Sequence, residues 1–479
     1  MTAASYDLVV IGMGAAGLAA AVGFTDAAAA QGRRTRMAVV ERSPVNERGG
    51  ATRYTSSWFR ITEDRRLDPS FVGLMESLSG GLADLDYCRT LEREVPATLD
   101  FLNEHGVEVT WETSPFPSRH TGGGGTPVGG GAAIVERLAE ILEGAAGVEL
   151  LYETEAVRLT LADDGRVDGV VVQGRDGSPH ELRAAAVIVA SGGFEGSPEL
   201  LAEYLGGRAS DLPLIAPGLA NNRGEGIRMT LAAGADTAGQ FDMFHGEPVD
   251  PRATKPDPVF FPFVYGILVN GSAERFFDEG QDSFDATFEA LGYEIWRNQD
   301  QTAFFIGDQT TLGLERIDEV IVTDVPPVSA ETIGELAVQL GLDPGALEQT
   351  VAEYNAAVGP EEFDPYAFDG KSTRGLEPPK SNWAFPLDSP PFVAYPLTCA
   401  ITFTFGGVRT DSSARVVTAA GEPIPGLYAA GEVTGVYYHG YPAGTSVLRS
   451  LTFGRLAGAN AARETAAVEA AVAWKSSKA

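Results

Sequence analysis

Three glycines near the start of the chain, Gly12, Gly14 and Gly17, have the spacing of a phosphate-binding turn. In such a GxGxxG turn between a strand and a helix, the first glycine permits the tight bend and the second lets the backbone approach a pyrophosphate. The third lets the helix pack closely on the strand. The first N–H groups of the helix and its partial positive charge then bind the phosphates. The three glycines therefore predict a dinucleotide site.

The segments around these glycines are those that such a site requires. Residues 6–12 (YDLVVIG) are typical of a buried parallel strand, and residues 17–32 (GLAAAVGFTDAAAAQG) of the helix that follows it. Residues 35–41 (TRMAVVE) read as a second strand that ends in Glu41. An acid about 20 residues beyond the glycines can accept hydrogen bonds from a ribose. A glycine-rich core helix is the alternative for the glycines alone, but it leaves the second strand and its acid unexplained.

Composition and charge limit the partners of this chain. Its formal net charge is −31, from 66 acidic and 35 basic residues among 479, so it should repel nucleic acid and anionic membranes. No run of about 18 uncharged apolar residues occurs, so we expect no membrane insertion. Two cysteines, Cys88 and Cys399, are too few for an intrinsic iron–sulfur cluster or zinc ribbon, and we expect no metal site. A cytoplasmic location is the default expectation.

Two later stretches end in small residues that can approach a cofactor. Residues 184–196 (AAAVIVASGGFEG) and 423–435 (PIPGLYAAGEVTG) each read as a buried strand followed by a turn, and the second turn contains Gly431 and Glu432. Residues 444–462 (GTSVLRSLTFGRLAGANAA) read as a loop that enters a helix. The positive end of that helix favours an electron-rich group, such as a reduced isoalloxazine ring.

Together these stretches resemble the FAD-dependent fumarate reductase/succinate dehydrogenase flavoprotein superfamily over essentially the whole chain. The resemblance is carried by the glycine turn and by VIVASGGFEG, YGILVNGSAERFFDEG, FTFGGVRTD and GLYAAGEVTG…FGRLAG. Within the superfamily, ERGGATR, NNRGEGIRM, FHGEPVDPRA and ERFFDEGQD are most similar to the tricarballylate dehydrogenase branch. Enzymes of that branch oxidise a CH–CH bond between carboxylates to an alkene.

The resemblance implies FAD as the cofactor. Relatives with covalent FAD carry a histidine in the segment that corresponds to GGATRYTSSW, and this chain has none there, so we expect non-covalent FAD. The predicted FAD contacts are Gly12, Gly14, Ala15, Ala16, Gly17, Glu41, Arg42, Gly49, Gly50, Ala51, Thr52, Val157, Ala190, Ser191, Gly192, Gly431, Glu432, Ser446, Val447 and Leu448.

The resemblance also implies an α/β fold with a discontinuous, Rossmann-like FAD-binding domain. Its first part would be residues 1–244 and its second part residues 380–479. Residues 245–379 would form an inserted α+β capping domain that closes over the flavin. Proline-rich stretches at 247–263 and 374–391 flank this middle segment and are typical of connectors between domains.

The substrate residues of the relatives are missing in their usual form. Phe403 stands where fumarate reductases carry a histidine, and Tyr441-Pro442 stand where they carry an arginine–asparagine pair. Residues 278–285 (DEGQDSFD) contain no counterpart of the arginine that shuttles protons. Fumarate and succinate are therefore doubtful substrates for this chain.

Other residues are the candidates for these roles. Arg275, His439 and Tyr438 are the predicted catalytic residues, because an anionic group needs cations and a proton needs a base. His245, Tyr441 and Arg275 are the predicted substrate-binding residues. Each has a structural alternative: Arg275 could pair with an acid of its own segment, His439 could be an exposed loop residue, and the others could pack under the cap.

The sequence thus predicts an FAD-dependent oxidoreductase that oxidises a CH–CH bond of a small carboxylate to an alkene, or the reverse, by hydride transfer to flavin N5. Two alternatives remain: a 3-ketosteroid-type desaturase with an apolar ring substrate, and a non-catalytic, redox-sensing flavoprotein. Because no haem or cluster motif is present, electrons should pass to a separate acceptor, which could be a protein, a quinone or oxygen.

Overall fold

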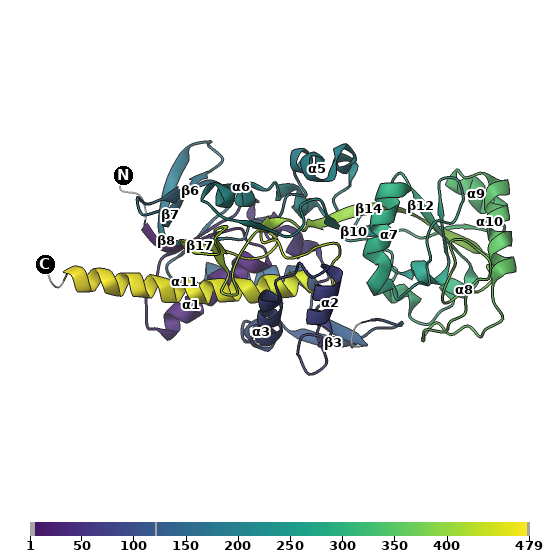
Figure 1. Cartoon of the computed structure of the whole chain (residues 1–479), viewed down its shortest axis with the longest axis horizontal. Coiled ribbons are helices and arrows are strands. Elements are labelled where there is room, and N and C mark those ends of the chain that lie inside the picture. The colour runs from purple at the N-terminus through teal and green to yellow at the C-terminus, as the bar shows by residue number, and fades with distance from the viewer. Residues whose placement is uncertain (1–4, 120–121, 477–479) are drawn as a thin grey trace.

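The computed structural model describes residues 5–119 and 122–476, and side chains as far as residue 467. Figure 1 shows two lobes that lie next to each other along the long axis of the molecule. Strands β10 (Phe244–Val249) and β14 (Phe392–Thr404) run from one lobe to the other. The two strands pair antiparallel from Phe244 with Thr404 to Val249 with Thr398, so they form a two-stranded connection between the lobes.

The larger lobe is built on a mixed sheet with a parallel centre. Its strand order is β16-β17-β8-β1-β2-β5, and β6 and β7 extend it as an antiparallel pair beside β8. All pairings between β17 and β5 along this order are parallel. The strands are β1 (Ser5–Ile11), β2 (Met37–Val40), β5 (Val148–Leu151), β6 (Glu155–Leu161), β7 (Val167–Gln173), β8 (Pro179–Val189), β16 (Arg415–Val417) and β17 (Pro423–Ala429).

This sheet is apolar on both faces, as expected for parallel strands covered on both sides. Along β1, Leu8 and Val10 belong to one buried cluster, whereas Val9 and Ile11 belong to the other. The second of these clusters continues into the smaller lobe, where it includes Phe305. One of the two clusters therefore extends through both lobes.

Helices α1 (Ala15–Ala30) and α11 (Ser446–Ser476) pack tightly on one side of this sheet. A Cβ atom added at Gly454 or Gly458 would overlap the backbone of α1 at Ala16 or Ala20. The alanine-rich sequence of α1 thus serves close helix packing. Figure 1 shows α11 running along α1. The lobe also contains α2 (Phe71–Leu78), α3 (Leu85–Glu104), α4 (Gly130–Glu143), α5 (Pro198–Leu205) and α6 (Glu225–Ala232), and the short pairs β3 (Val109–Thr113) with β4 (Gly123–Pro127) and β9 (Thr237–Ala238) with β15 (Gly407–Val408).

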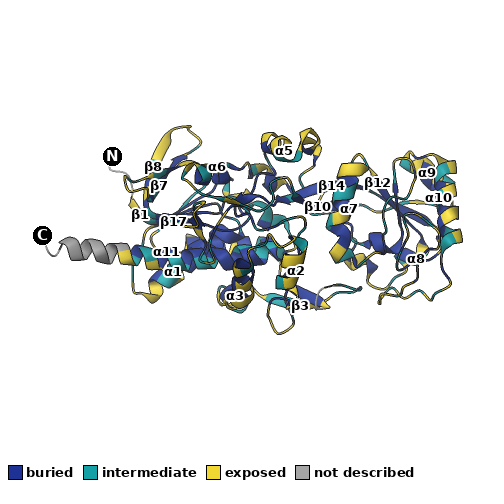
Figure 2. Cartoon of the chain, in the orientation of Figure 1, coloured by how far each residue is buried: buried dark blue, intermediate teal, exposed yellow. Residues whose placement is uncertain are grey.

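The smaller lobe is an antiparallel sheet with helices on its outside. Its order is β10-β14-β12-β11, and β13 pairs with the start of β14. In Figure 2 its strands are mostly buried, while α9 and α10 expose their outer faces. The remaining elements are β11 (Ile267–Asn270), β12 (Ala303–Gly307), β13 (Val328–Ala330), α7 (Phe284–Asn298), α8 (Gln309–Leu312), α9 (Ile333–Leu340) and α10 (Pro344–Ala357).

The sequence places β14 in the second part of the larger domain, but its first half belongs to the sheet of the smaller lobe. Val393–Leu397 pair with β12, and only the second half of β14 pairs with β10. The mixed α/β fold with a parallel sheet is confirmed. The domain limits at 244/245 and 379/380 remain a prediction.

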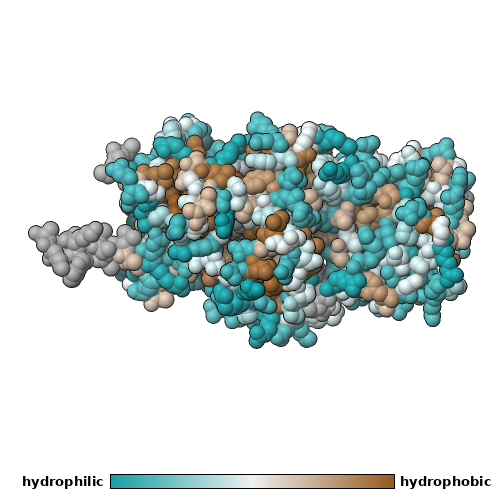
Figure 3. All heavy atoms as spheres, in the orientation of Figure 1, coloured by the Kyte–Doolittle hydropathy of each residue, from teal (hydrophilic) through white to brown (hydrophobic). Residues whose placement is uncertain are grey.

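The surface agrees with the acidic composition. On the face shown in Figure 3, hydrophilic residues predominate on the outside of both lobes, and hydrophobic residues gather in the middle of the larger lobe. Among the described residues, no helix combines the length and the apolar character needed to span a bilayer.

Candidate functional site

A cavity of about 670 Å³ lies at the carboxyl ends of the parallel strands and reaches the smaller lobe. Open α/β sheets bind their ligands at this edge. Part of its lining comes from the residues that follow these strands: residues 12–16 after β1, 41–43 after β2, 190–192 after β8 and 431–432 shortly after β17, with residues 154–156 where the chain passes from β5 into β6.

The glycine turn has the geometry that its spacing predicts. Gly12 has a φ of +102°, and a Cβ there would overlap the carbonyl oxygen of Ala190. A Cβ at Gly17 would overlap the carbonyl oxygen of Gly12, so Gly17 serves packing and does not line the cavity. Gly14 does line it, and a Cβ there would meet no protein atom closer than 3.6 Å. A side chain at Gly14 would therefore project into space that the protein leaves open for a ligand.

Two side chains fix the backbone of this turn. The carboxylate of Glu41, which is buried, accepts hydrogen bonds from the N–H of Met13 (2.9 Å) and of Ser43 (2.8 Å). The hydroxyl of Thr52 accepts one from the N–H of Ala15 (3.0 Å). Glu41 thus joins the loops after β1 and β2 and still lines the cavity.

Most of the predicted cofactor residues line this cavity. They are Gly12, Gly14, Ala15, Ala16, Glu41, Arg42, Gly49, Gly50, Ala51, Thr52, Ala190, Ser191, Gly192, Gly431, Glu432, Ser446 and Val447. Gly17, Val157 and Leu448 do not. The side chain of Val157 is turned outward on β6 and is 46% exposed, and its neighbour Ala156 lines the cavity instead, because successive residues of a strand face opposite sides. Leu448 is fully buried on the inner side of α11.

A pair of buried carboxyl groups stands behind Gly431. The amide nitrogen of Asn222 donates to Oε1 of Glu195 (2.6 Å) and to Oε2 of Glu432 (3.5 Å), and the N–H of Thr404 donates to Oε1 of Glu432 (2.9 Å). Burial, and then the charge of Glu432, raise the pKa of Glu195 well above its ordinary value. Glu195 therefore keeps its proton to a higher pH than an exposed glutamate does.

At the smaller lobe, His245 of β10 is held between two glutamates. Its Nδ1 bonds to Glu289 of α7, and its Nε2 lies 2.8 Å from Oε1 of Glu247. Burial disfavours the imidazolium, but the charges and hydrogen bonds of the two glutamates outweigh burial and raise the pKa of His245 to about 10. His245 is thus a cation whose charge is already balanced.

Asp257 adds a second titratable group to the same wall. It lines the cavity with a φ of +59°, in the left-handed region. Burial, and then the charge of Glu247, raise the pKa of Asp257 to about 7. The other carboxylate oxygen of Glu247, Oε2, is buried and has no hydrogen-bond partner among the described residues. A proton can therefore be gained or lost on this wall near neutral pH.

Tyr441 lies between this cluster and the start of α11. Its hydroxyl accepts hydrogen bonds from the N–H of Thr445 (2.9 Å) and of Ser446 (3.0 Å). The N–H of Ser446, which the sequence assigns to the cofactor, is thus already engaged. The ring centroid of Tyr441 lies 4.6 Å from that of His245 and 5.0 Å from that of Phe403. The structure therefore brings the predicted substrate residues His245 and Tyr441 together.

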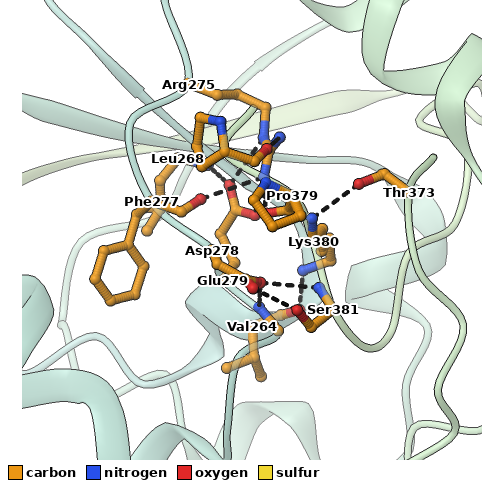
Figure 4. A network of polar contacts seen from close by, with 12 residues as sticks. Val264, Leu268, Arg275, Phe277, Asp278, Glu279, Thr373, Pro379, Lys380 and Ser381 are labelled. Atoms are coloured by element: carbon orange, nitrogen blue, oxygen red, sulfur yellow. Dashed lines mark hydrogen bonds and ion pairs between the residues drawn. The ribbon is translucent and has the colours of Figure 1, made fainter. Parts of the chain in front are cut away.

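The three predicted catalytic residues lie elsewhere. Figure 4 shows Arg275 inside the smaller lobe, where its Nη2 lies 2.6 Å from Oε2 of Glu279 and its Nη1 donates to the carbonyl of Pro378 (2.7 Å). The hydroxyl of Tyr438 accepts a hydrogen bond from the N–H of Gly239 (2.9 Å). His439 is exposed on its loop. None of the three lines the cavity, so the described contacts give the catalytic assignment no support, and it stays a prediction.

The acidic side chains around His245 were not among the predicted site residues. Glu247 had a usable signal, since residues two apart on a strand share a face. Glu289 arrives from a helix distant in sequence, and no spacing reveals it. At this end the described residues that line the cavity include many aromatic and acidic ones, namely Phe261, Phe284, Phe288, Phe403, Tyr441, Glu247, Asp257, Asp285 and Glu319, along with His245, aliphatic side chains and the hydroxyls of Ser118 and Thr402.

Comparisons with known proteins agree with this geometry. A family model described as FAD binding domain matches residues 7–447. The cytochrome-type fumarate reductase of Shewanella frigidimarina is 28% identical over 473 residues, which cover 96% of this chain and 77% of the reductase. The 4-oxocyclohex-2-ene-1-carboxylate 5-dehydrogenase of Sinomonas cyclohexanicum is 32% identical over 355 residues, which cover 68% of this chain and 58% of that enzyme.

One solved structure is similar along nearly its whole length. It is the 3-ketosteroid-delta4-(5alpha)-dehydrogenase of Rhodococcus jostii RHA1, in complex with 4-androstene-3,17-dione. It matches with a TM-score of 0.71 and 27% sequence identity, and the match covers 96% of this chain and 97% of that one.

Proposed function

Because the chain belongs to the FAD-dependent fumarate reductase/succinate dehydrogenase flavoprotein superfamily, we propose that it forms, or in reverse reduces, a carbon–carbon double bond beside the ketone of an uncharged cyclic substrate. It is an enzyme, an FAD-dependent oxidoreductase that acts on CH–CH groups. The uncharged ring ketone is the specific substrate class that we propose. The competing substrate class is the tricarballylate-like carboxylate that the sequence favours.

The residues around the cavity fit FAD. The open side of Gly14 and the start of α1 suit a pyrophosphate, Glu41 suits a ribose, and the hydroxyl oxygen of Ser191 is buried on the cavity wall without a partner among the described residues. When bound, FAD accepts or donates a hydride. The smaller lobe contributes to the same cavity, so it serves as the cap that keeps water from the reacting carbons.

The charge of the substrate end is the observation that carries the ring-ketone proposal. Among the described residues that line the cavity there is no lysine, and the only arginines are Arg42 and Arg449. Arg42 is bound to Glu155 and Glu225 at the cofactor end, each at 2.9 Å. On the wall that holds Glu247 and Asp257, a polycarboxylate would face acids, and Arg449 lies on the other wall, by α11, where Nε and Nη1 are bonded to neutral groups. Two like charges 4 Å apart repel by about 4 kcal/mol at an effective dielectric constant of about 20.

The aromatic side chains support a ring. Phe261, Phe284, Phe288 and Phe403 offer apolar faces against which a flat or puckered ring can pack. The names of the Sinomonas and Rhodococcus relatives both describe ring ketones, of which the Sinomonas compound also carries one carboxylate, whereas the Shewanella relative is named for a dicarboxylate. Both substrate classes are therefore represented among relatives, and the lining favours the first.

Proton transfer is assigned to the wall that holds Asp257. A CH–CH oxidation removes a hydride from one carbon and a proton from its neighbour. A carboxylate with a pKa of about 7 can take that proton at Oδ of Asp257 and release it near neutral pH. The hydroxyl of Tyr441 is engaged with Thr445 and Ser446, so Tyr441 offers the substrate its ring, and His245 holds Glu247 and Glu289 in position.

The electrons then leave for a separate acceptor. The described chain contains no cluster of ligands for a metal centre, and the sequence contains no haem or iron–sulfur motif. The reduced cofactor therefore has to be reoxidised by a protein, a quinone or oxygen.

An anaerobic test of flavin reduction separates the hypotheses. The oxidised holoenzyme is mixed with a matched pair of ring ketones, uncharged 4-methylcyclohexanone and anionic 4-oxocyclohexanecarboxylate, and also with 4-androstene-3,17-dione and with tricarballylate. We expect an uncharged ketone to bleach the FAD absorbance fastest and tricarballylate to leave it unchanged. Fastest bleaching by tricarballylate would restore the carboxylate hypothesis. If no compound bleaches the FAD absorbance and no enone reoxidises the reduced protein, the result would support a redox-sensing flavoprotein.

A further inference from the structure

Arg449 is a buried cation on the cavity wall that has no carboxylate partner among the described residues. It lies one turn inside α11 and is 2% exposed. The other arginines with buried side chains in the described chain are paired: Arg48 with Glu136 and Glu143, Arg60 with Asp68, and Arg275 with Glu279. A buried charge is costly unless an opposite charge or strong hydrogen bonds compensate it.

Neutral groups occupy the donors of Arg449. Its Nη1 donates to the carbonyl of Gly431 (3.1 Å) and to the hydroxyl of Thr434 (3.1 Å), and its Nε donates to the hydroxyl of Tyr437 (3.1 Å). Its Cζ also lies 5.0 Å from the ring centroid of Tyr437. These contacts fix the guanidinium through Nε and Nη1, but they leave its charge unbalanced among the described residues.

The contacts of Arg449 place it beside the end of the cavity where the substrate is oxidised. The ring of Tyr437 lies 5.1 Å from that of Tyr441 and 5.9 Å from that of Phe403, and both of these line the substrate end. The hydroxyl of Tyr437 lies 3.1 Å from that of Thr445, at the loop that enters α11. The positive end of α11 and the charge of Arg449 therefore act on the same wall.

We propose that Arg449 is a positioning residue for electron transfer, whose unbalanced charge stabilises the electron-rich reduced form of FAD and so raises its midpoint potential. The missing counter-charge is then supplied by the cofactor when it takes up electrons. The proposal rests on FAD as the cofactor and is independent of the substrate class proposed above.

The test compares holoenzyme variants by potentiometric titration of FAD, a readout that does not depend on turnover. Arg449→Met and Arg449→Gln remove the charge, whereas Arg449→Lys keeps it. The matched control is Arg455→Met on the same helix, because Arg455 is paired with Glu94 (2.8 Å) and does not line the cavity.

We expect each neutral variant to bind reduced FAD at least tenfold less tightly relative to oxidised FAD. For a two-electron couple this lowers the midpoint potential by about 30 mV or more. Arg449→Lys should retain most of the potential, and Arg455→Met should not change it. An unchanged potential in the neutral variants, or a shift of equal size in Arg455→Met, overturns the proposal.

A second variant keeps the arginine in place in case its removal prevents folding. Thr434→Asp introduces a carboxylate where the hydroxyl already contacts Nη1 of Arg449. The new carboxylate balances the charge of Arg449 while the guanidinium keeps its structural contacts. We therefore expect the midpoint potential of FAD to fall in this variant too. A purely structural role for Arg449 predicts a stable protein with the wild-type potential, and that result would refute the proposal.

Discussion

The imidazole of His245 lies between the carboxylates of Glu247, at 2.8 Å, and Glu289; His245 and Glu247 are buried and line the substrate end of the cavity, and Glu289 lies half-buried behind them. Both nitrogens of the imidazole are thus engaged by carboxyl groups, so His245 offers no free cation to an anionic substrate. His245 instead keeps both glutamates in fixed positions.

We first predict a loss of stability at alkaline pH that depends on His245. The pKa of His245 is raised to about 10 in the folded protein, so its contribution is fully present below the ordinary histidine pKa of about 6.5 and is lost as the pH rises through about 10. His245→Asn should destabilise the protein at pH 6 by about 3–5 kcal/mol, because two buried carboxylates lose their cation. Urea unfolding at several pH values measures both effects. Equal pH dependence of the variant and the wild type above pH 7 would contradict the assignment.

The second prediction concerns Asp257 as the proton acceptor. Asp257→Asn should slow substrate-dependent flavin reduction by about a hundredfold or more and should remove a pH step near 7, because the pKa of Asp257 is raised to about 7. FAD content should not change. Asp324→Asn is the control, since Asp324 is exposed and contacts Thr254 outside the cavity. Stopped-flow reduction across pH 5–9 tests this, and a variant that keeps the step near 7 would assign the titration to another group.

The cofactor end was predictable because its signals are local. Gly12, Gly14 and Gly17 are separated by two or three residues, and the conformations they require depend on the backbone alone. The position of Glu41 was predictable because one helix and one strand separate it from the glycine turn. The error at Val157 is a shift of one residue on a strand, which reverses the direction of the side chain.

The substrate end was harder to predict because its residues come from separate elements. His245, Glu289 and Tyr441 meet only when β10, α7 and the loop before α11 pack together. The sequence does show that Arg275 and Glu279 lie four residues apart, but this spacing cannot tell whether the arginine binds a substrate or its neighbour. In the structure Arg275 is paired with Glu279.

The third prediction reassigns Arg275 from catalysis to stability. The buried carboxylate of Glu279 accepts hydrogen bonds from Arg275 and from the N–H of Leu268 (2.8 Å). Arg275→Met should cost about 3–5 kcal/mol, because it leaves that carboxylate without its cation. The variant that remains folded should still be reduced by substrate within a few-fold of the wild-type rate. Thermal unfolding and anaerobic reduction measure the two effects, and a hundredfold slower reduction with unchanged stability would return Arg275 to the active site.

The fourth prediction is that FAD is not covalently attached. The segment from Gly49 to Trp58 lines the cavity and contains no histidine, the residue that anchors the flavin in covalently flavinylated relatives. Precipitation with trichloroacetic acid should release all the yellow colour into the supernatant. Colour that stays with the denatured protein would show a covalent bond elsewhere in the chain.

The last prediction separates the two functions of glycine in the phosphate-binding turn. Gly14→Val should fold, because a Cβ at Gly14 meets no protein atom closer than 3.6 Å, but the side chain would occupy the space required by the pyrophosphate. Its FAD content should therefore fall to background while its circular dichroism spectrum remains that of the apoprotein. Gly17→Val should instead reduce the yield of folded protein, because a Cβ there overlaps the carbonyl oxygen of Gly12. Gly73→Ala, on α2 with open space around its Cα, is the control for both. A folded Gly14→Val protein with full FAD content would show that the pyrophosphate binds elsewhere.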